Sequence, residues 1–149
     1  MPWTPAQRTR LVTEKRILEQ FFPGRVQWID PQGDTKVEVS LNTNNGNKYR
    51  LRIYLKAADS SSSDFPNSVP DMVVCSSPKP MPKWGADGKK HTLGYRDNFV
   101  KICHYRTSRW TDRSTLYEVV MKGRVWLEAY EGHLMTGKCL SEFLGEMRN

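Results

Sequence analysis

The spacing of apolar residues predicts a helix at the beginning of the chain. Thr4 can act as its N-cap, Pro5 suits the first helical position, and Gln7 completes a capping box. Apolar residues then recur at helical intervals, at Leu11, Leu18 and Phe22. The residues Phe-Pro-Gly-Arg at positions 22–25 interrupt this pattern, so the predicted helix ends there.

Alternation of apolar and polar residues predicts strands in the next part of the chain. Residues 36–41 read Lys-Val-Glu-Val-Ser-Leu. Residues 48–56 place four apolar side chains on one face, namely Tyr49, Leu51, Ile53 and Leu55. A shorter alternation covers residues 26–28, and an apolar run at 71–75 predicts a fourth strand. Turn sequences separate these segments, which indicates a half-buried antiparallel meander.

Proline and glycine exclude regular structure over residues 76–91. A loop of this length inside a compact domain is usually functional or disordered. From Leu116 to Leu134 the apolar residues return to a period of 3.6, and Gly137 can end that helix. A last amphipathic segment carries Leu140, Phe143, Leu144 and Met147. This order predicts an α+β class, with one domain over residues 1–149 and one sheet.

The composition indicates a folded protein that is reduced and lies in the cytoplasm. Of the 149 residues, 38% are apolar and 11% aromatic, which is enough for a packed core. No stretch approaches the roughly 18 uninterrupted apolar residues of a membrane span, and the first residues lack the apolar run of a secretory signal. Three cysteines, Cys75, Cys103 and Cys139, are odd in number and widely spaced, so we expect no disulfide framework. We also expect no metal site and no cofactor.

The formal net charge of +7 indicates an acidic partner, which nucleic acid or an acidic protein surface would satisfy. A solvated basic surface that only keeps the protein in solution is a third explanation. The basic residues are scattered, and no recognised nucleic-acid-binding module appears in the sequence. Charge alone therefore gives only weak support to nucleic-acid binding.

Cys103 is the strongest candidate for chemistry in the chain. It follows an apolar residue at a predicted strand end, with His104 beside it and His91 twelve positions earlier. Basic residues lie nearby in the sequence, at Lys101, Arg106 and Arg109, and cations lower the pKa of a thiol. A free cysteine is more often a small buried hydrophobe, so the residues alone leave both roles open.

The order of motifs around Cys103 resembles the ubiquitin-conjugating-enzyme family. Residues 65–74, Phe-Pro-Asn-Ser-Val-Pro-Asp-Met-Val-Val, look like the family's aromatic-Pro-x-x-x-Pro segment before the fourth strand. His91 is similar to the histidine that opens the active-site segment, and Cys103 takes the place of the thioester cysteine. Trp110–Thr115 resembles the segment that starts the following helix. Residues 125–140 resemble bacterial members most closely.

The resemblance implies a ubiquitin-conjugating-like fold, with an N-terminal helix, a four-stranded antiparallel meander, an irregular active-site segment and C-terminal helices. It implies a transferase in which Cys103 and His91 are catalytic. Cys103 would carry the C-terminus of a ubiquitin-like modifier, or of a cGAS-like nucleotidyltransferase, as a thioester and pass it to a target lysine. Bacterial members of this kind often belong to anti-phage operons, including CBASS systems. An activating enzyme, if one is required, would be a separate protein.

Several points stay open at the level of sequence. Eukaryotic members have His-Pro-Asn where this chain reads His-Thr-Leu at 91–93, so the donor that would stabilise an oxyanion is not identified. His91 suits a structural role in the loop better than proton transfer. His104 would point to the opposite side from Cys103, and Trp110 would be a packing anchor. We expect Cys75 in the core and see no activating neighbour for Cys139.

Two other functions compete with the enzyme. The first is a scaffold with the same fold and no activity, which binds protein partners; the cysteine at the family's catalytic position argues against it. The second is a basic protein that binds nucleic acid, supported only by charge.

Overall fold

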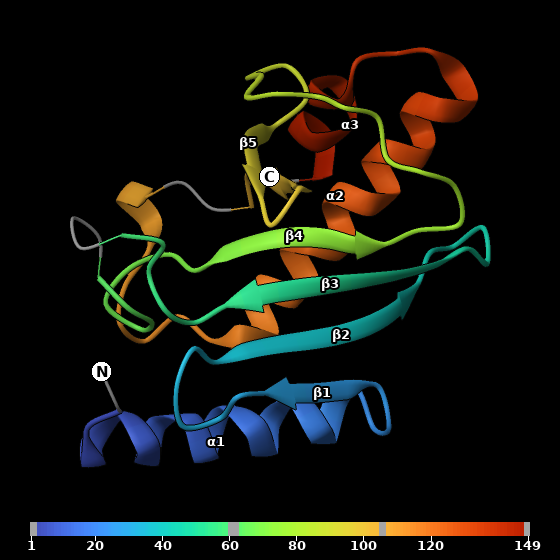
Figure 1. Cartoon of the computed structure of the whole chain (residues 1–149). Helices are drawn as coiled ribbons and strands as arrows, with labels where there is room; N and C mark the ends of the chain where they lie inside the picture. The colour runs from blue at the N-terminus through green and yellow to red at the C-terminus, as the bar shows by residue number, and fades with distance from the viewer. Residues whose placement is uncertain (1–2, 60–62, 105–106, 148–149) are drawn as a thin grey trace.

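The computed structural model describes residues 3–59, 63–104 and 107–147. The chain begins with helix α1 (Pro5–Phe21) and continues through strands β1 (Val26–Ile29), β2 (Lys36–Asn42), β3 (Lys48–Tyr54) and β4 (Asp71–Ser76). Strands β5 (Thr92–Arg96) and β6 (Phe99–Ile102) follow, then a short 3₁₀ turn (Thr107–Arg109). Helices α2 (Leu116–Thr136) and α3 (Leu140–Met147) complete the fold. The predicted α+β class is confirmed (Figure 1).

The sheet has six strands in the order β1-β2-β3-β4-β6-β5, each antiparallel to its neighbours. The prediction of four strands was therefore wrong, because residues 92–102 form a hairpin rather than an irregular segment. Asp97 and Asn98 both have positive φ, 53° and 66°, which suits a two-residue turn that matches the twist of paired strands. Both strands of the hairpin are short and lack a clean apolar alternation, so the pattern predicted only the strand end before Cys103 and not the hairpin.

Helix α1 begins and ends as predicted. The Gln7 amide donates to Thr4 Oγ1 at 3.2 Å, and the Thr4 amide donates to Gln7 Oε1 at 2.8 Å, so the capping box is present. Pro5 occupies the first turn, and Gly24, with φ of 71°, lets the chain reverse into β1. The helix lies along the β1 edge of the sheet in Figure 1.

Helix α2 packs against one face of the sheet, and the core lies between them (Figure 1). The inward residues of β2 and β3 pair directly, as Val39 does with Leu51, and both are fully buried. Gly123 allows close approach, because a Cβ atom there would lie 2.6 Å from Leu51 Cδ1. Leu134 belongs to the predicted apolar stripe but is 57% exposed, because it lies in the last turn of α2.

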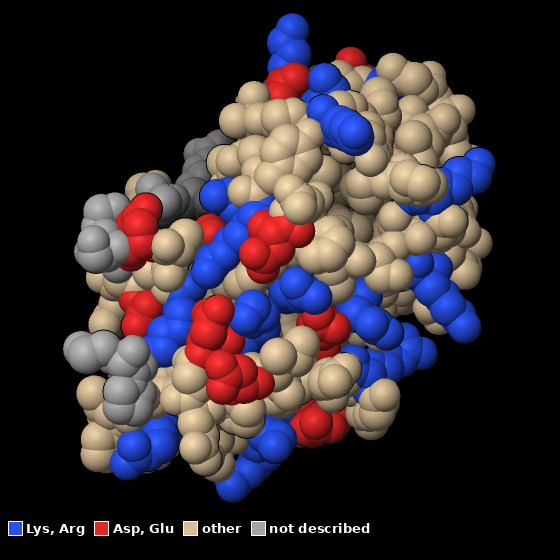
Figure 2. All heavy atoms as spheres, viewed as in Figure 1, with Lys and Arg blue, Asp and Glu red and all other residues tan. Residues whose placement is uncertain are grey.

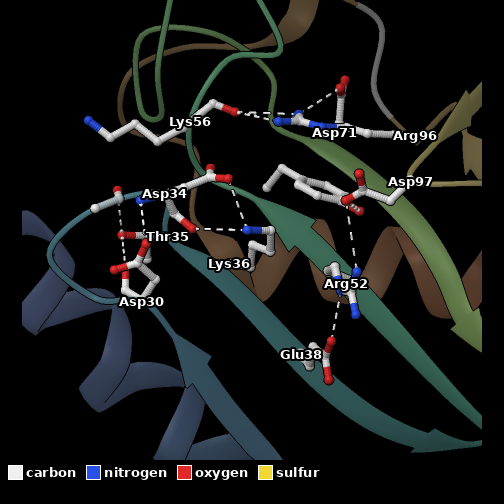
Figure 3. A network of polar contacts seen from close by, with 12 residues as sticks. Asp30, Asp34, Thr35, Lys36, Glu38, Arg52, Lys56, Asp71, Arg96 and Asp97 are labelled. Carbon is white, nitrogen blue, oxygen red and sulfur yellow. Dashed lines mark hydrogen bonds and ion pairs between the residues drawn. The ribbon is translucent and has the colours of Figure 1, made fainter. Parts of the chain in front are cut away.

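The opposite face of the sheet carries a network of ion pairs (Figure 3). Glu38 on β2 accepts from Arg52 Nε at 2.7 Å, and Arg52 also lies 4.0 Å from Asp97 in the β5–β6 turn. Arg96 of β5 reaches Asp71 of β4 at 3.0 Å. Acidic and basic side chains therefore alternate over this face, as Figure 2 shows. No helix within the described ranges is both long enough and apolar enough to cross a membrane.

Candidate active site

Cys103 is the first residue after β6, and its side chain is half-buried. Its amide donates to the His91 carbonyl at 2.8 Å. Thr92 pairs with Ile102, so His91 and Cys103 form the next rung beyond the β5–β6 ladder. The fold thus brings together the two residues that the sequence singled out, through a hydrogen bond between their main chains.

The segment beside Cys103, residues 89–91, is held through its own three carbonyl groups, each of which accepts a hydrogen bond from another part of the fold. The Lys89 carbonyl lies 3.4 Å from Cys139 Sγ, and the Lys90 carbonyl accepts from Trp126 Nε1 at 3.1 Å. The His91 carbonyl accepts from the Cys103 amide. Helix α2, the start of α3 and the end of β6 each provide one of these donors. Residues 89–91 are therefore fixed even though they lie in a loop.

His91 adopts a left-handed backbone conformation with φ of 52°. Residues other than glycine are uncommon there, and histidine is among those that occur most often. The side chain is half-buried. Its carbonyl contact with Cys103 agrees with a structural role in the loop, and a role for the imidazole in catalysis stays a prediction.

His104 lies on the interior side of the chain, with only 4% of its surface exposed. Its Nδ1 is 3.3 Å from the Ile102 carbonyl oxygen. Successive side chains of an extended segment point to opposite sides, and Cys103 next to it is more exposed. His104 is thus a packing residue, as its position beside Cys103 predicted.

Two of the three basic residues near Cys103 in sequence, Lys101 and Arg109, are described by the structure. The Lys101 ammonium lies 3.8 Å from Asp71 Oδ2 and shares that carboxylate with Arg96. Arg109 is exposed in the 3₁₀ turn. Arg106 lies outside the described residues. Lys101 is therefore engaged with Asp71 on the outer face of the sheet.

The other two cysteines have contrasting environments. Burial raises the pKa of Cys75 to about 11, and its Sγ contacts the Arg50 carbonyl at 3.4 Å. The pKa of the Cys139 thiol is lowered instead, because the thiol forms a hydrogen bond with Ser141, whose Oγ lies 3.3 Å from the sulfur. The prediction that Cys139 has no activating neighbour was wrong. The serine two residues later was the signal in the sequence.

Trp110 is a packing anchor, as predicted. Its indole Nε1 donates to the Pro66 carbonyl at 2.8 Å, and its ring meets Phe65 edge-on at 6.1 Å between centroids. Two segments that carry the family resemblance, residues 65–70 and Trp110–Thr115, are therefore in contact. Thr115 then caps α2, accepting a hydrogen bond from the Glu118 amide at 3.1 Å.

Asn98 is too far from Cys103 to stabilise an oxyanion there. It lies in the β5–β6 turn, and the two residues are five positions apart along an extended chain that rises about 3.3 Å per residue. That spacing corresponds to roughly 16 Å. The Cys103 amide already donates to His91, so it is not a spare donor either.

Among the residues that the structure describes, no group of three His, Cys, Asp or Glu side chains is placed to hold a metal ion. The arrangement around Cys103 places a half-buried cysteine on a backbone that is hydrogen-bonded to a neighbouring loop. Comparison of the chain with protein-family models, with curated proteins and with solved structures finds no match.

Proposed function

We propose that this protein is a ubiquitin-conjugating-like acyl carrier that uses Cys103 as its nucleophile. The observation that carries the proposal is the half-buried Cys103 immediately after β6, with its amide bonded to the His91 carbonyl. A carrier cysteine must be reachable by a large acyl donor and must stay fixed while the donor docks. A strand end held by a neighbouring loop meets both needs.

The reaction consists of two acyl transfers. In the first, the Cys103 thiolate attacks the C-terminal carbonyl of a donor protein that a separate ATP-dependent enzyme has activated. A thioester forms, and the activating group leaves with the bonding electron pair. In the second, an amine of the target attacks the thioester, the C–S bond breaks, and the thiolate returns while the amine loses a proton. Cysteine suits this cycle because its thiolate is both a good nucleophile and a good leaving group.

Cys103 is preferred to the other thiols for different reasons. Cys75 is a poor nucleophile at neutral pH, because burial keeps its pKa at about 11. Cys139 has a lowered pKa and is the real competitor. Cys103 alone matches the family's order of motifs, with His91 before it and Trp110 after it. The contact between Trp110 and Pro66 supports the same alignment.

The acyl donor that we propose is a ubiquitin-like modifier or a cGAS-like nucleotidyltransferase, with a target lysine as the acceptor and bacterial anti-phage defence as the setting. Support comes from the resemblance of residues 125–140 to bacterial conjugating enzymes. The net charge of +7 would also favour docking of an acidic donor surface.

The test is to incubate the protein with the donor, its activating enzyme and ATP, and to follow adducts on gels with and without reductant. The wild type is expected to form an adduct that reductant cleaves. Cys103→Ser should give a reductant-stable ester or no adduct, and Cys103→Ala should give none. Cys139→Ala and Cys75→Ala are the matched controls and should behave as the wild type. An adduct that survives in Cys103→Ala but is lost in Cys139→Ala would assign the chemistry to Cys139.

A second variant in the same assay distinguishes a main-chain role of His91 from a role of its side chain. Asparagine also tolerates positive φ, so His91→Asn keeps the backbone conformation and the carbonyl contact with Cys103. If the residue acts through its main chain, the rate of thioester formation should stay within about threefold of wild type. A side chain that transfers protons would instead contribute about 10²–10⁴-fold and shape the pH–rate profile.

An inactive scaffold of the same fold is the second candidate. It is favoured by the missing asparagine in His-Thr-Leu at 91–93 and by the position of Asn98 at the far end of β6. A scaffold would bind its partner with the same affinity in the wild type and in Cys103→Ala, and it would form no adduct with activated donor.

A further inference from the structure

A row of polar and basic residues crosses four neighbouring segments of the sheet on its outer face, which is the face opposite α2. Ser40 pairs with Arg50, and a register shift in β3–β4 sets Arg50 opposite Ser76. The Ser40 amide also donates to the Arg25 carbonyl at 3.0 Å, which adds Arg25 to the row. Asn42 and Lys48 form the next pair along the same two strands. Neighbouring strands are about 4.8 Å apart, so long side chains from the row can reach a common point.

These residues line a cavity of about 460 Å³ that is open to solvent. Its polar lining consists of Arg25, Ser40, Asn42, Lys48, Arg50 and Ser76. Three of the six are cations, two are hydroxyl donors, and one is an amide. No acidic side chain belongs to the lining within the part of the chain that the structure describes. Figure 2 shows basic side chains gathered over the end of the sheet where β2 ends and β3 begins.

The positive charge in this cavity is largely uncompensated. Glu38 is the nearest acid, at 3.8 Å from Arg50 Nη1, but its other oxygen accepts from Arg52 Nε at the shorter distance of 2.7 Å. No ion pair between described residues involves Arg25 or Lys48, and both side chains are exposed. The rest of the outer face differs, because Arg96, Lys101 and Arg52 are each paired with a carboxylate.

We propose that this cavity, the β2–β3 anion site, binds phosphoryl groups. Cations combined with hydroxyl and amide donors match the charge and the several acceptor oxygens of a phosphate. Leu41 and Tyr49 also line the cavity, but both are buried, and the Tyr49 hydroxyl donates to Glu131. Tyr49 therefore offers no free ring face on which a nucleobase could stack, and recognition is by charge rather than by base. The site can take a free polyphosphate or the backbone of a single-stranded nucleic acid, and these two sources are separated by experiment.

The β2–β3 anion site is distinct from the candidate active site. Lys101 of β6 lies opposite Val73 in an antiparallel pair, so Cys103 is level with Asp71 at one end of β4, whereas Ser76 is the other end of that strand. Five residues of strand correspond to about 16 Å. Loss of phosphate binding would therefore leave the acyl-carrier proposal untouched, and the reverse also holds.

The experiment measures binding of tripolyphosphate by calorimetry and of a short oligothymidylate by fluorescence anisotropy, both at low salt and across a salt series. The variant is Arg25→Gln with Lys48→Gln, which removes two exposed cations that make no ion pair with described residues. The control is Lys15→Gln with Arg16→Gln, two exposed cations of α1 with the same change in net charge. Circular dichroism and thermal unfolding establish that both variants are folded.

We expect the site variant to weaken tripolyphosphate binding at least about tenfold, with the control within about twofold of wild type. If the oligonucleotide is the ligand, the same variant should also lower the slope of log K against log salt by about 1.4, which corresponds to two lost phosphate contacts. Binding of tripolyphosphate but not of the oligonucleotide would assign a free polyphosphate. Equal losses in the site and control variants, or no binding of either probe at low salt, would overturn the proposal.

Discussion

Glu131 is a buried carboxylate near the C-terminal end of α2, and it accepts hydrogen bonds from several side chains. Asn47 Nδ2 donates to it at 2.6 Å, the Tyr49 hydroxyl at 2.8 Å and Asn45 Nδ2 at 3.1 Å. Burial alone would raise the pKa of Glu131, but these donors, together with Thr43, outweigh burial and lower it. Burial and the carboxylate together raise the pKa of Tyr49. The ionised carboxylate of Glu131 therefore stabilises the contact between α2 and the β2–β3 turn.

We expect Glu131→Gln to lower the free energy of unfolding at neutral pH by about 2–3 kcal/mol, because an amide group would face several donors with one acceptor oxygen. The pKa of Glu131 is lower in the folded state than its ordinary value of 4.5. Its contribution is thus fully present above that value and is lost as the pH falls through the folded pKa.

Urea titrations at several pH values check this prediction. The stability difference between wild type and Glu131→Gln should shrink on acidification below about pH 4.5. Glu142→Gln, an exposed residue on α3, is the control and should cost under about 0.5 kcal/mol at every pH. A difference that does not change with pH would show that Glu131 contributes by packing rather than by charge.

At the scale of elements, contact between α2 and the sheet depends on the absence of a side chain at Gly123. A Cβ atom there would lie 2.6 Å from Leu51 Cδ1 and 2.7 Å from Met72 Cε. Both are ends of flexible side chains in a filled core, so they would have to move. Alanine gains about 1 kcal/mol in helix propensity over glycine, while overpacking typically costs 1–3 kcal/mol. Overpacking is the larger of the two effects.

We expect Gly123→Ala to lower the free energy of unfolding by about 1 kcal/mol, and Gly123→Val by about 3 kcal/mol. Met72→Ala, which alone leaves a cavity, should cost less in the Gly123→Ala background because the new methyl group occupies part of that space. A double-mutant cycle measured by chemical denaturation checks this coupling. If the single effects are additive, the new methyl group does not compete with the Met72 side chain for space, and α2 instead moves away from the sheet.

At the scale of the whole molecule, α1 connects the beginning of the chain to the start of α2. Glu14 is 2% exposed and accepts from the Leu116 amide at 2.7 Å, a contact between residues 102 positions apart. It also accepts from Arg10 Nε at 2.9 Å, and Arg10 Nη2 donates to the Ser114 carbonyl at 2.7 Å. This pair supplies charge and hydrogen bonds to the first turn of α2, beside the segment that follows Cys103.

We expect Glu14→Ala to lower the free energy of unfolding by about 3 kcal/mol, because it removes the partner of Arg10 and leaves the buried Leu116 amide without an acceptor. Glu19→Ala, an exposed acid on the same helix, should change it by less than about 0.5 kcal/mol. Guanidinium unfolding followed by tryptophan fluorescence measures both variants. Equal small effects would show that α1 docks through its apolar face alone.

The sequence by itself determined the elements whose causes are local. The capping box at Thr4 and Gln7, the alternation in β2 and β3 and the end of α2 at Gly137 involve residues a few positions apart, so neighbouring residues suffice to predict them. Cys103 at a strand end was predictable for the same reason. Leu134 shows the limit of this reasoning, because periodicity cannot tell where the sheet beneath a helix stops.

The tertiary structure alone decided the features that depend on contacts between distant segments. The β5–β6 hairpin joins the sheet because β6 pairs with β4, and residues 89–91 are fixed by donors from Cys103, Trp126 and Cys139. The β2–β3 anion site requires the strand register that sets Arg50 between Ser40 and Ser76. Neither the pairing of strands nor the position of a side chain relative to remote charges follows from local pattern, because both depend on how the whole chain closes around one core.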